Sequence, residues 1–104
     1  RQHPEFFLTD WTFAMALDRD ARIRRTKFRA WHRGTREADY MIGGFFDRHG
    51  AGFSEEDFLW FERLLEEQDV DIMAWGLGTQ TVPEPFDGPL MEKFKRLDFI
   101  EIPR

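Results

Sequence analysis

Apolar residues recur with the period of an α-helix along most of this chain, in segments separated by glycine and proline. In the clearest segment, 35–50, they follow one another at i, i+3, i+4, i+7 and i+8, which places them on one face of a helix. Such a face is stable only when it is buried against other helices. The sequence therefore predicts an all-α fold, a compact bundle of about five short helices. The residues on this face are Ala38, Met41, Ile42, Phe45 and Phe46.

Residues that cap helices predict where the five helices begin and end. A short oxygen-bearing side chain at an N-terminus satisfies free backbone N–H groups, whereas glycine often follows the last turn. Proline is tolerated at the first helical position. The expected helices run from Asp18 or Asp20 to about Trp31, from Thr35 to about Gly50, from Ser54 through Leu65, from Asp69 or Asp71 to Gly76 or Gly78, and from Pro89 through Leu97; the tail from Phe99 to Ile102 is expected to be coil.

Two features of the composition bear on packing. Gly43 and Gly44 interrupt the second expected helix, and each should destabilise it by about 1 kcal/mol relative to alanine. Close packing of another helix against them would explain their presence. Twelve phenylalanines and four tryptophans are many for 104 residues. Some should fill the core, and others are expected to remain for a partner surface.

Residues 1–14 differ from the rest, because their apolar residues show no helical or strand period. Met15 is a candidate natural start. We expect residues 1–14 to be an upstream extension and residues 15–104 to form a single helical domain. The alternative is a natural N-terminal arm that docks its aromatic side chains on the domain. The apolar residues of this segment are Phe6, Phe7, Leu8, Trp11 and Phe13.

Several classes of chemistry find no support in the sequence. Without cysteine there is no disulfide, thiol nucleophile or cysteine-bound zinc. The three histidines lack the spacing of metal ligands, and no glycine-rich phosphate loop occurs. The twenty acids leave paired-carboxylate catalysis open, but most fall in expected first turns or on polar faces. We therefore expect a binding protein that is not an enzyme, with no catalytic residue, metal or cofactor of its own.

No apolar run approaches the roughly 20 residues that a membrane helix needs, and the first residues lack the order of a secretory signal. We therefore expect no direct membrane insertion and a cytoplasmic location.

Charge is distributed unevenly along the chain. Eight basic residues and one acid give segment 19–36 a charge of +7, so the remainder carries −12. A basic helix can neutralise phosphates, which makes nucleic-acid binding through the first helix one alternative function. The acidic domain and the lack of a nucleic-acid-binding motif argue against it, and we expect no nucleic-acid partner.

The most informative segment spans residues 29–39. Gly34 lies where one expected helix meets the next, and without a Cβ it can turn the chain sharply or let another surface come close. Arg33 and Arg36 carry planar donor groups suited to carboxylates, and Glu37 and Asp39 supply opposite charge. These residues fit either a docking surface or a simple helix break with local ion pairs.

At this segment the sequence resembles the succinate dehydrogenase assembly factor 2 family, whose signature Arg-Gly-x-x-Glu reads here Arg33-Gly34-Thr35-Arg36-Glu37. Two further blocks are similar in order and spacing, and the resemblance covers about residues 18–98. In the second block Val70 replaces a proline that many members have between the two acids. The blocks are Phe61-Glu62-Arg63-Leu64-Leu65-Glu66 and Asp69-Val70-Asp71-Ile72-Met73-Ala74-Trp75, followed by the closing Pro89-Leu90 helix.

The resemblance implies a five-helix assembly factor of the bacterial cytoplasm. Such a factor binds the flavoprotein subunit of succinate dehydrogenase, and sometimes of fumarate reductase. It promotes covalent attachment of FAD to a histidine of that subunit, and we expect it to be a monomer when free. A regulatory or antitoxin-like module that binds a small membrane protein is the other alternative. The residues that the resemblance places on the contact surface are Arg33, Gly34 and Glu37, with Asp39, Arg29, His32 and Arg36 beside them.

Overall fold

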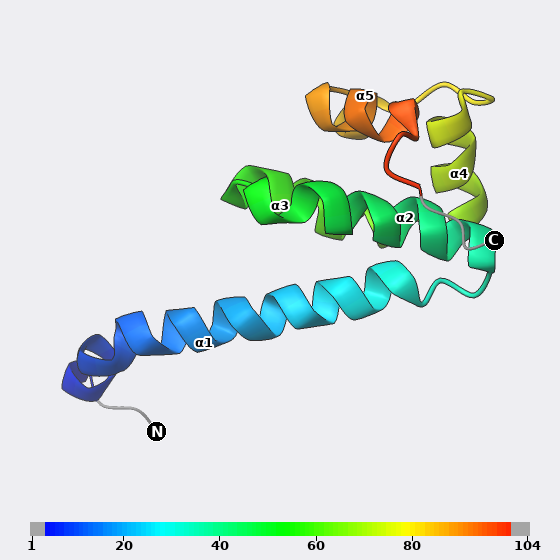
Figure 1. Ribbon diagram of the computed structural model, residues 1–104. Coiled ribbons are helices and arrows are strands. Elements are labelled where there is room, and N and C mark those ends of the chain that lie inside the picture. The colour runs from blue at the N-terminus through cyan, green and yellow to red at the C-terminus, as the bar shows by residue number, and fades with distance from the viewer. Residues whose placement is uncertain (1–3, 101–104) are drawn as a thin grey trace.

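The computed structural model describes the backbone of residues 4–100 and the side chains of residues 18–100. Five α-helices make up this part of the chain, and no strand occurs within residues 4–100 (Figure 1). The all-α prediction is confirmed. The helices are α1 (Pro4–Trp31), α2 (Arg36–His49), α3 (Glu55–Leu64), α4 (Asp69–Leu77) and α5 (Pro89–Arg96), with 3-10 turns η1 (Gly50–Gly52) and η2 (Glu84–Phe86).

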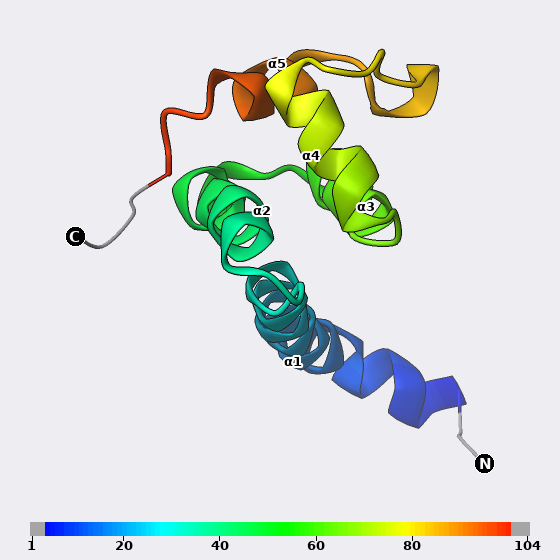
Figure 2. The same cartoon turned by 90° about the vertical axis from the view of Figure 1, so that its right-hand side faces the viewer.

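The helices are stacked in layers. Helix α1 lies along one side of α2 and α3, and α4 rises from the end of α3 towards α5, which covers the opposite side (Figures 1 and 2). Helices α1 and α2 form a hairpin, so the loop between them makes a corner at one end of the molecule (Figure 1). This corner contains the segment that the sequence singled out.

Aromatic rings fill the core between the layers. Phe45 of α2 is fully buried, and its ring centroid lies 6.0 Å from that of Phe61, 5.3 Å from that of Phe94 and 5.4 Å from that of Phe99. Rings from two helices and the C-terminal tail thus meet on α2. The whole apolar face predicted for segment 35–50 is buried, because α2 has neighbours on several sides.

Most of the predicted helix ends are confirmed. Thr35 caps α2 by accepting the Ala38 N–H, and Ser54 and Asp57 form a reciprocal capping box at α3. Gly78 ends α4 in the left-handed conformation, with φ of 80°.

The cap predicted for α4 is wrong. The N-cap is Gln68, which makes no side-chain cap hydrogen bond, and Asp69 is already the first helical residue. The carboxylate of Asp69 binds Arg33 instead, as described below. The Asp69 carboxylate, which sequence position alone would assign to the helix cap, therefore makes a contact with another part of the fold.

Glycines inside the helices mark close contacts. A Cβ on Gly43 would lie 2.3–2.6 Å from atoms of the Trp31 indole, so the ring of α1 rests directly on the α2 backbone. The prediction that Gly76 stops α4 is wrong. It lies inside the helix, where a Cβ would meet Phe94 at 2.7 Å and Met41 at 2.9 Å. The missing Cβ in both places permits close approach of packed groups.

Helix α1 begins at Pro4 and not at Asp18 or Asp20. Neither glycine nor proline occurs between Pro4 and Gly34, so nothing breaks the helix, and proline is acceptable in its first turn. The helix extends past the others (Figure 1). The radius of gyration is accordingly 16.3 Å, against about 13 Å for a compact chain of this size.

Some predictions concern residues outside the described part. Residues 1–3 and the side chains of residues 4–17 lie outside it, which includes all five apolar residues of the N-terminal segment. The boundary at residue 15 stays a prediction. In the tail, Phe99 and Ile100 are irregular, as expected, and residues 101 and 102 lie outside the described residues.

No helix within the described residues combines the length and the hydropathy that crossing a membrane requires.

Candidate partner-binding site

Gly34 forms the corner between α1 and α2. Its φ is +114°, a conformation in which an L side chain is strained, so the turn requires glycine. No atom lies within 4 Å of the position that a Cβ would occupy. The backbone of the corner is therefore open to the approach of another molecule.

Arg33 points inward from the corner. Its Nε donates to Asp69 Oδ1 at 2.7 Å, and its two terminal nitrogens donate to the carbonyl oxygens of Leu65 and Glu67, each at 3.1 Å. Only 11% of the side chain is exposed. The guanidinium thus fastens the corner to the turn between α3 and α4, and it is not free for a partner.

Two other predicted contact residues are also engaged within the domain. Asp39 is half-buried, and its Oδ1 accepts the Arg33 backbone N–H at 2.7 Å. Arg29 donates to Glu66 Oε2 at 2.7 Å, which ties α1 to the turn between α3 and α4. Arg33, Asp39 and Arg29 therefore shape the corner from within.

The remaining predicted residues are exposed. Arg36 and Glu37 occupy the first turn of α2, and their side chains make no hydrogen bond or ion pair with any residue of the described part. The carboxylate of Glu37 suits the positive end of the helix dipole. His32 and Gly34 complete an exposed set of backbone, imidazole, guanidinium and carboxylate groups. These groups can make charge-assisted hydrogen bonds to a docked protein.

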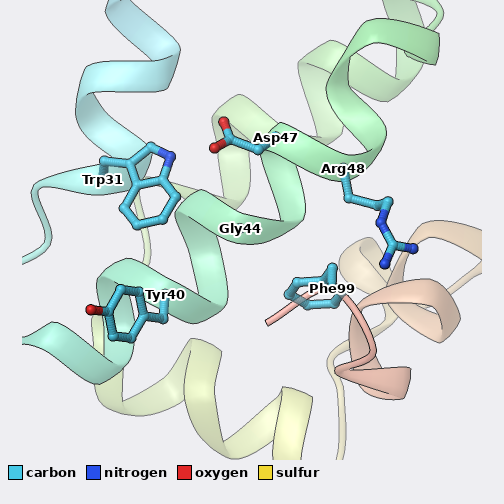
Figure 3. Close-up of a pocket in the computed structure, with 6 residues that line it drawn as sticks. All are labelled: Trp31, Tyr40, Gly44, Asp47, Arg48 and Phe99. Carbon is cyan, nitrogen blue, oxygen red and sulfur yellow. The ribbon is translucent and has the colours of Figure 1, made fainter. Parts of the chain in front are cut away.

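Two shallow hollows adjoin the corner and share a wall. Trp31 and Tyr40 line both of them, and their rings meet edge to face at 6.1 Å and 82°. The hollow at the corner, of about 710 Å³, also includes His32, Gly34 and Arg36. In the second hollow, of about 390 Å³, Trp31, Tyr40 and Phe99 lie around the bare backbone at Gly44 (Figure 3). Sequence reasoning missed Tyr40, because only the α1–α2 packing brings it beside Trp31.

A second group of ion pairs lies away from the corner and attaches α1 to α3. Arg22 donates to Glu62 at 2.7 Å and to Glu55 at 2.9 Å, and its guanidinium lies 4.7 Å from the Phe58 ring centroid. The hydrogen bond lowers the pKa of Glu62 and raises the pKa of Arg22, because it favours both charged forms.

Half of the basic segment is consequently used inside the fold. Besides Arg22, Arg29 and Arg33, Lys27 pairs with Asp47 of α2 at 2.9 Å. These pairings with acids elsewhere in the domain weaken the nucleic-acid alternative, since paired cations neutralise phosphates poorly. Among residues 18–100 no group of three histidine, aspartate or glutamate side chains is placed to hold a metal ion.

Known proteins of one family match most of the chain. Residues 24–98 match the family described as flavinator of succinate dehydrogenase. The chain is 38% identical over 73 residues to the FAD assembly factor SdhE of Acetobacter pasteurianus, and 37% identical over 71 residues to that of Shewanella oneidensis. It is 29% identical over 83 residues to the mitochondrial succinate dehydrogenase assembly factor 2 of Debaryomyces hansenii.

These matches include 70%, 68% and 80% of this chain, in the same order. They span 67% of the Acetobacter protein, 82% of the Shewanella protein and about half (55%) of the Debaryomyces protein. No solved structure matches the chain.

Proposed function

The chain belongs to the flavinator of succinate dehydrogenase family, and on this premise we propose that it is an assembly factor for the flavoprotein subunit of succinate dehydrogenase. It binds that subunit and promotes the covalent attachment of FAD to it. In this role it is a binding protein and not an enzyme, and it is a monomer when free. The observation that carries the proposal is the family match over residues 24–98, within which the family signature forms an exposed, glycine-centred corner.

The corner is suited to docking because it is ordered before a partner arrives. Four hydrogen bonds from Arg33, one from its backbone and three from its side chain, fix the loop that presents Gly34 and Glu37. A preorganised surface loses little conformational entropy on binding, so more of the contact energy remains as affinity.

Docking can promote flavin attachment without supplying a reacting group. The flavin carries the difficult chemistry itself, and the flavoprotein supplies the residue that is modified. A helper needs only to bind more tightly to the conformation in which the two are aligned, which shifts the population towards it. The exposed Gly34, Arg36, Glu37 and His32 make the contact in this proposal, whereas Arg33, Asp39 and Arg29 hold its shape.

Replacement of Glu37 by Gln tests the contact site. Glu37 is exposed and has no hydrogen-bond or ion-pair partner among the described residues. The free energy of unfolding of the variant should therefore lie within about 0.5 kcal/mol of the wild-type value. We expect its affinity for the apo-flavoprotein subunit to fall at least about tenfold, because removing one member of a hydrogen-bonded interfacial charge pair costs about 2 kcal/mol or more. Titration calorimetry measures the affinity, and in-gel flavin fluorescence of the subunit measures attachment.

Glu92→Gln is the matched control, because Glu92 is also an exposed acid in the first turn of a helix, α5. The control should bind and promote flavinylation as the wild type does. Equal behaviour of the two variants would contradict the placement of Glu37 at the interface. Failure of the wild-type protein to bind the subunit or raise its flavin content would contradict the function itself.

A further inference from the structure

Phe28 on the outer face of α1 is the exception among the phenylalanines of this domain. It is 62% exposed, whereas every other phenylalanine among the described side chains is buried. Burying a phenylalanine side chain stabilises a fold by about 1.5–3 kcal/mol, and an exposed ring does not make this contribution. Helical period explains the exposure, because Ile23 and Ala30 define the face of α1 that packs on the domain. The fold itself makes no use of this ring.

The ring is nevertheless held in place. It stacks on the imidazole of His32, with centroids 3.9 Å apart and planes within 14° of each other. His32 Nδ1 lies 2.7 Å from the Phe28 carbonyl oxygen, which can only accept, so Nδ1 carries the hydrogen and Nε2 remains for a partner. Because both rings are ordered beforehand, their burial in an interface loses little side-chain entropy.

The stack is continuous with the corner. His32 lines the corner hollow together with Gly34 and Arg36, and Phe28 stacks on its imidazole. A partner that contacts the corner therefore meets Phe28 next along α1.

Two exposed cations flank the ring. Arg24 and Arg25 precede Phe28 by four and three residues, which places them one turn away on the same side of the helix. Both are exposed, and neither makes a hydrogen bond or ion pair with residues 18–100. An aromatic ring with cations beside it complements an apolar pocket that has carboxylates at its rim.

We infer that the contact surface for the flavoprotein subunit continues from the corner along the outer face of α1. Phe28 inserts into an apolar pocket of that subunit, and acidic groups at the rim of the pocket meet Arg24 and Arg25. The inference rests on the proposed function, because it names further contacts of the same partner. It makes Phe28 a docking residue outside the segment that carries the family signature.

Replacement of Phe28 by Ala tests the inference, with Leu77→Ala as the matched control. Leu77 is 57% exposed and lies at the end of α4, where the chain approaches α5 and is remote from α1 (Figure 1). We expect Phe28→Ala to weaken binding of the apo-flavoprotein subunit at least about tenfold, the usual loss when a central aromatic anchor is truncated. Leu77→Ala should leave the dissociation constant within about twofold of the wild type. Thermal unfolding of each variant confirms that the fold persists.

A charge-reversal variant, Arg24→Glu with Arg25→Glu, tests the acidic rim separately. It should slow association several-fold at low salt, and the difference from the wild type should shrink as salt is added, because screening removes the steering. An unchanged association rate would overturn the acidic rim.

The outcomes separate the two proposals. If Glu37→Gln weakens binding but Phe28→Ala behaves as Leu77→Ala does, the inference fails and the proposed function stands. If the wild-type protein does not bind the subunit, both fail. If Phe28→Ala instead changes the sedimentation of the free protein, the face joins copies of this chain and the inference is again overturned.

Discussion

Arg33 joins two segments that lie far apart in the sequence. Its 2.7 Å contact with Asp69 connects the Arg-Gly-x-x-Glu signature to the Asp-x-Asp block at the start of α4. An arginine beside a glycine reads as a docking residue when only its neighbours are known. Its donors are instead satisfied by a carboxylate and by the carbonyl oxygens of Leu65 and Glu67. At the scale of a residue, the signature therefore contains both a structural and an exposed part.

Replacement of Arg33 by Ala should consequently reduce stability. We expect the free energy of unfolding to fall by about 2–3 kcal/mol, because hydrogen bonds that involve a charged group contribute about 1.5–3 kcal/mol and the truncation leaves carbonyl oxygens without donors. Urea denaturation measures the difference. Arg36→Ala is the control, since this exposed arginine should change stability by no more than about 0.5 kcal/mol. Equal midpoints for the two variants would contradict the structural role of Arg33.

At the scale of an element, the packing of α1 on α2 defines the corner. The Trp31 indole rests on Gly43, and the same indole forms the wall shared by the two hollows. The glycine that weakens α2 locally thus permits the contact that positions Trp31. This contact explains why a helix former is absent from the middle of an otherwise regular amphipathic helix.

The two adjacent glycines of α2 should respond oppositely to alanine. Gly43→Ala should destabilise the domain by about 1–3 kcal/mol, because the added Cβ would lie within 2.6 Å of indole atoms and must displace the ring. At Gly44 the nearest atoms belong to Phe99 at 3.5 Å, an ordinary contact, so Gly44→Ala should be neutral or stabilising by up to about 1 kcal/mol. Thermal unfolding of the two variants distinguishes them. Stabilisation by both variants would show that the α1–α2 contact is looser than described.

At the scale of the whole molecule, the protonation of one half-buried histidine at the end of α2 couples stability to pH. His49 lies against Phe45 and Phe99, and its Nε2 is buried without a hydrogen-bond partner among the described residues. Burial lowers the pKa of His49 below its ordinary value of 6.5, and the nearby Lys93, Arg48 and Arg96 lower it further, against a weaker opposing effect of Asp98. The fold therefore favours the neutral form of this imidazole.

Stability should accordingly depend on pH in the mildly acidic range. Because the unfolded chain protonates His49 more readily, the free energy of unfolding is highest above the ordinary pKa of 6.5 and falls as the pH drops below it. The slope due to this group is at most about 1.4 kcal/mol per pH unit, the limit for one proton. Urea titrations between about pH 7.5 and about pH 5.5 measure it, above the range in which Glu62 titrates. His49→Gln should flatten the dependence, and an unchanged slope in that variant would contradict the assignment.

The sequence by itself determined the number of helices, most of their ends and the family. Period and capping chemistry act over three or four residues, so the buried face of α2, the cap at Thr35 and the capping box at Ser54 could be predicted without coordinates. The signature at Arg33–Glu37 was equally visible as a pattern of residue types. Each of these features depends only on neighbours along the chain.

Only the tertiary structure decided what the side chains of the corner do. It turned Arg33 inward, assigned Asp69 to that arginine instead of to the cap of α4, and placed Trp31 on Gly43. It also left Phe28 in solvent beside His32. These outcomes depend on contacts between residues on different helices or on which side of α1 meets the domain, and local rules contain no information about either.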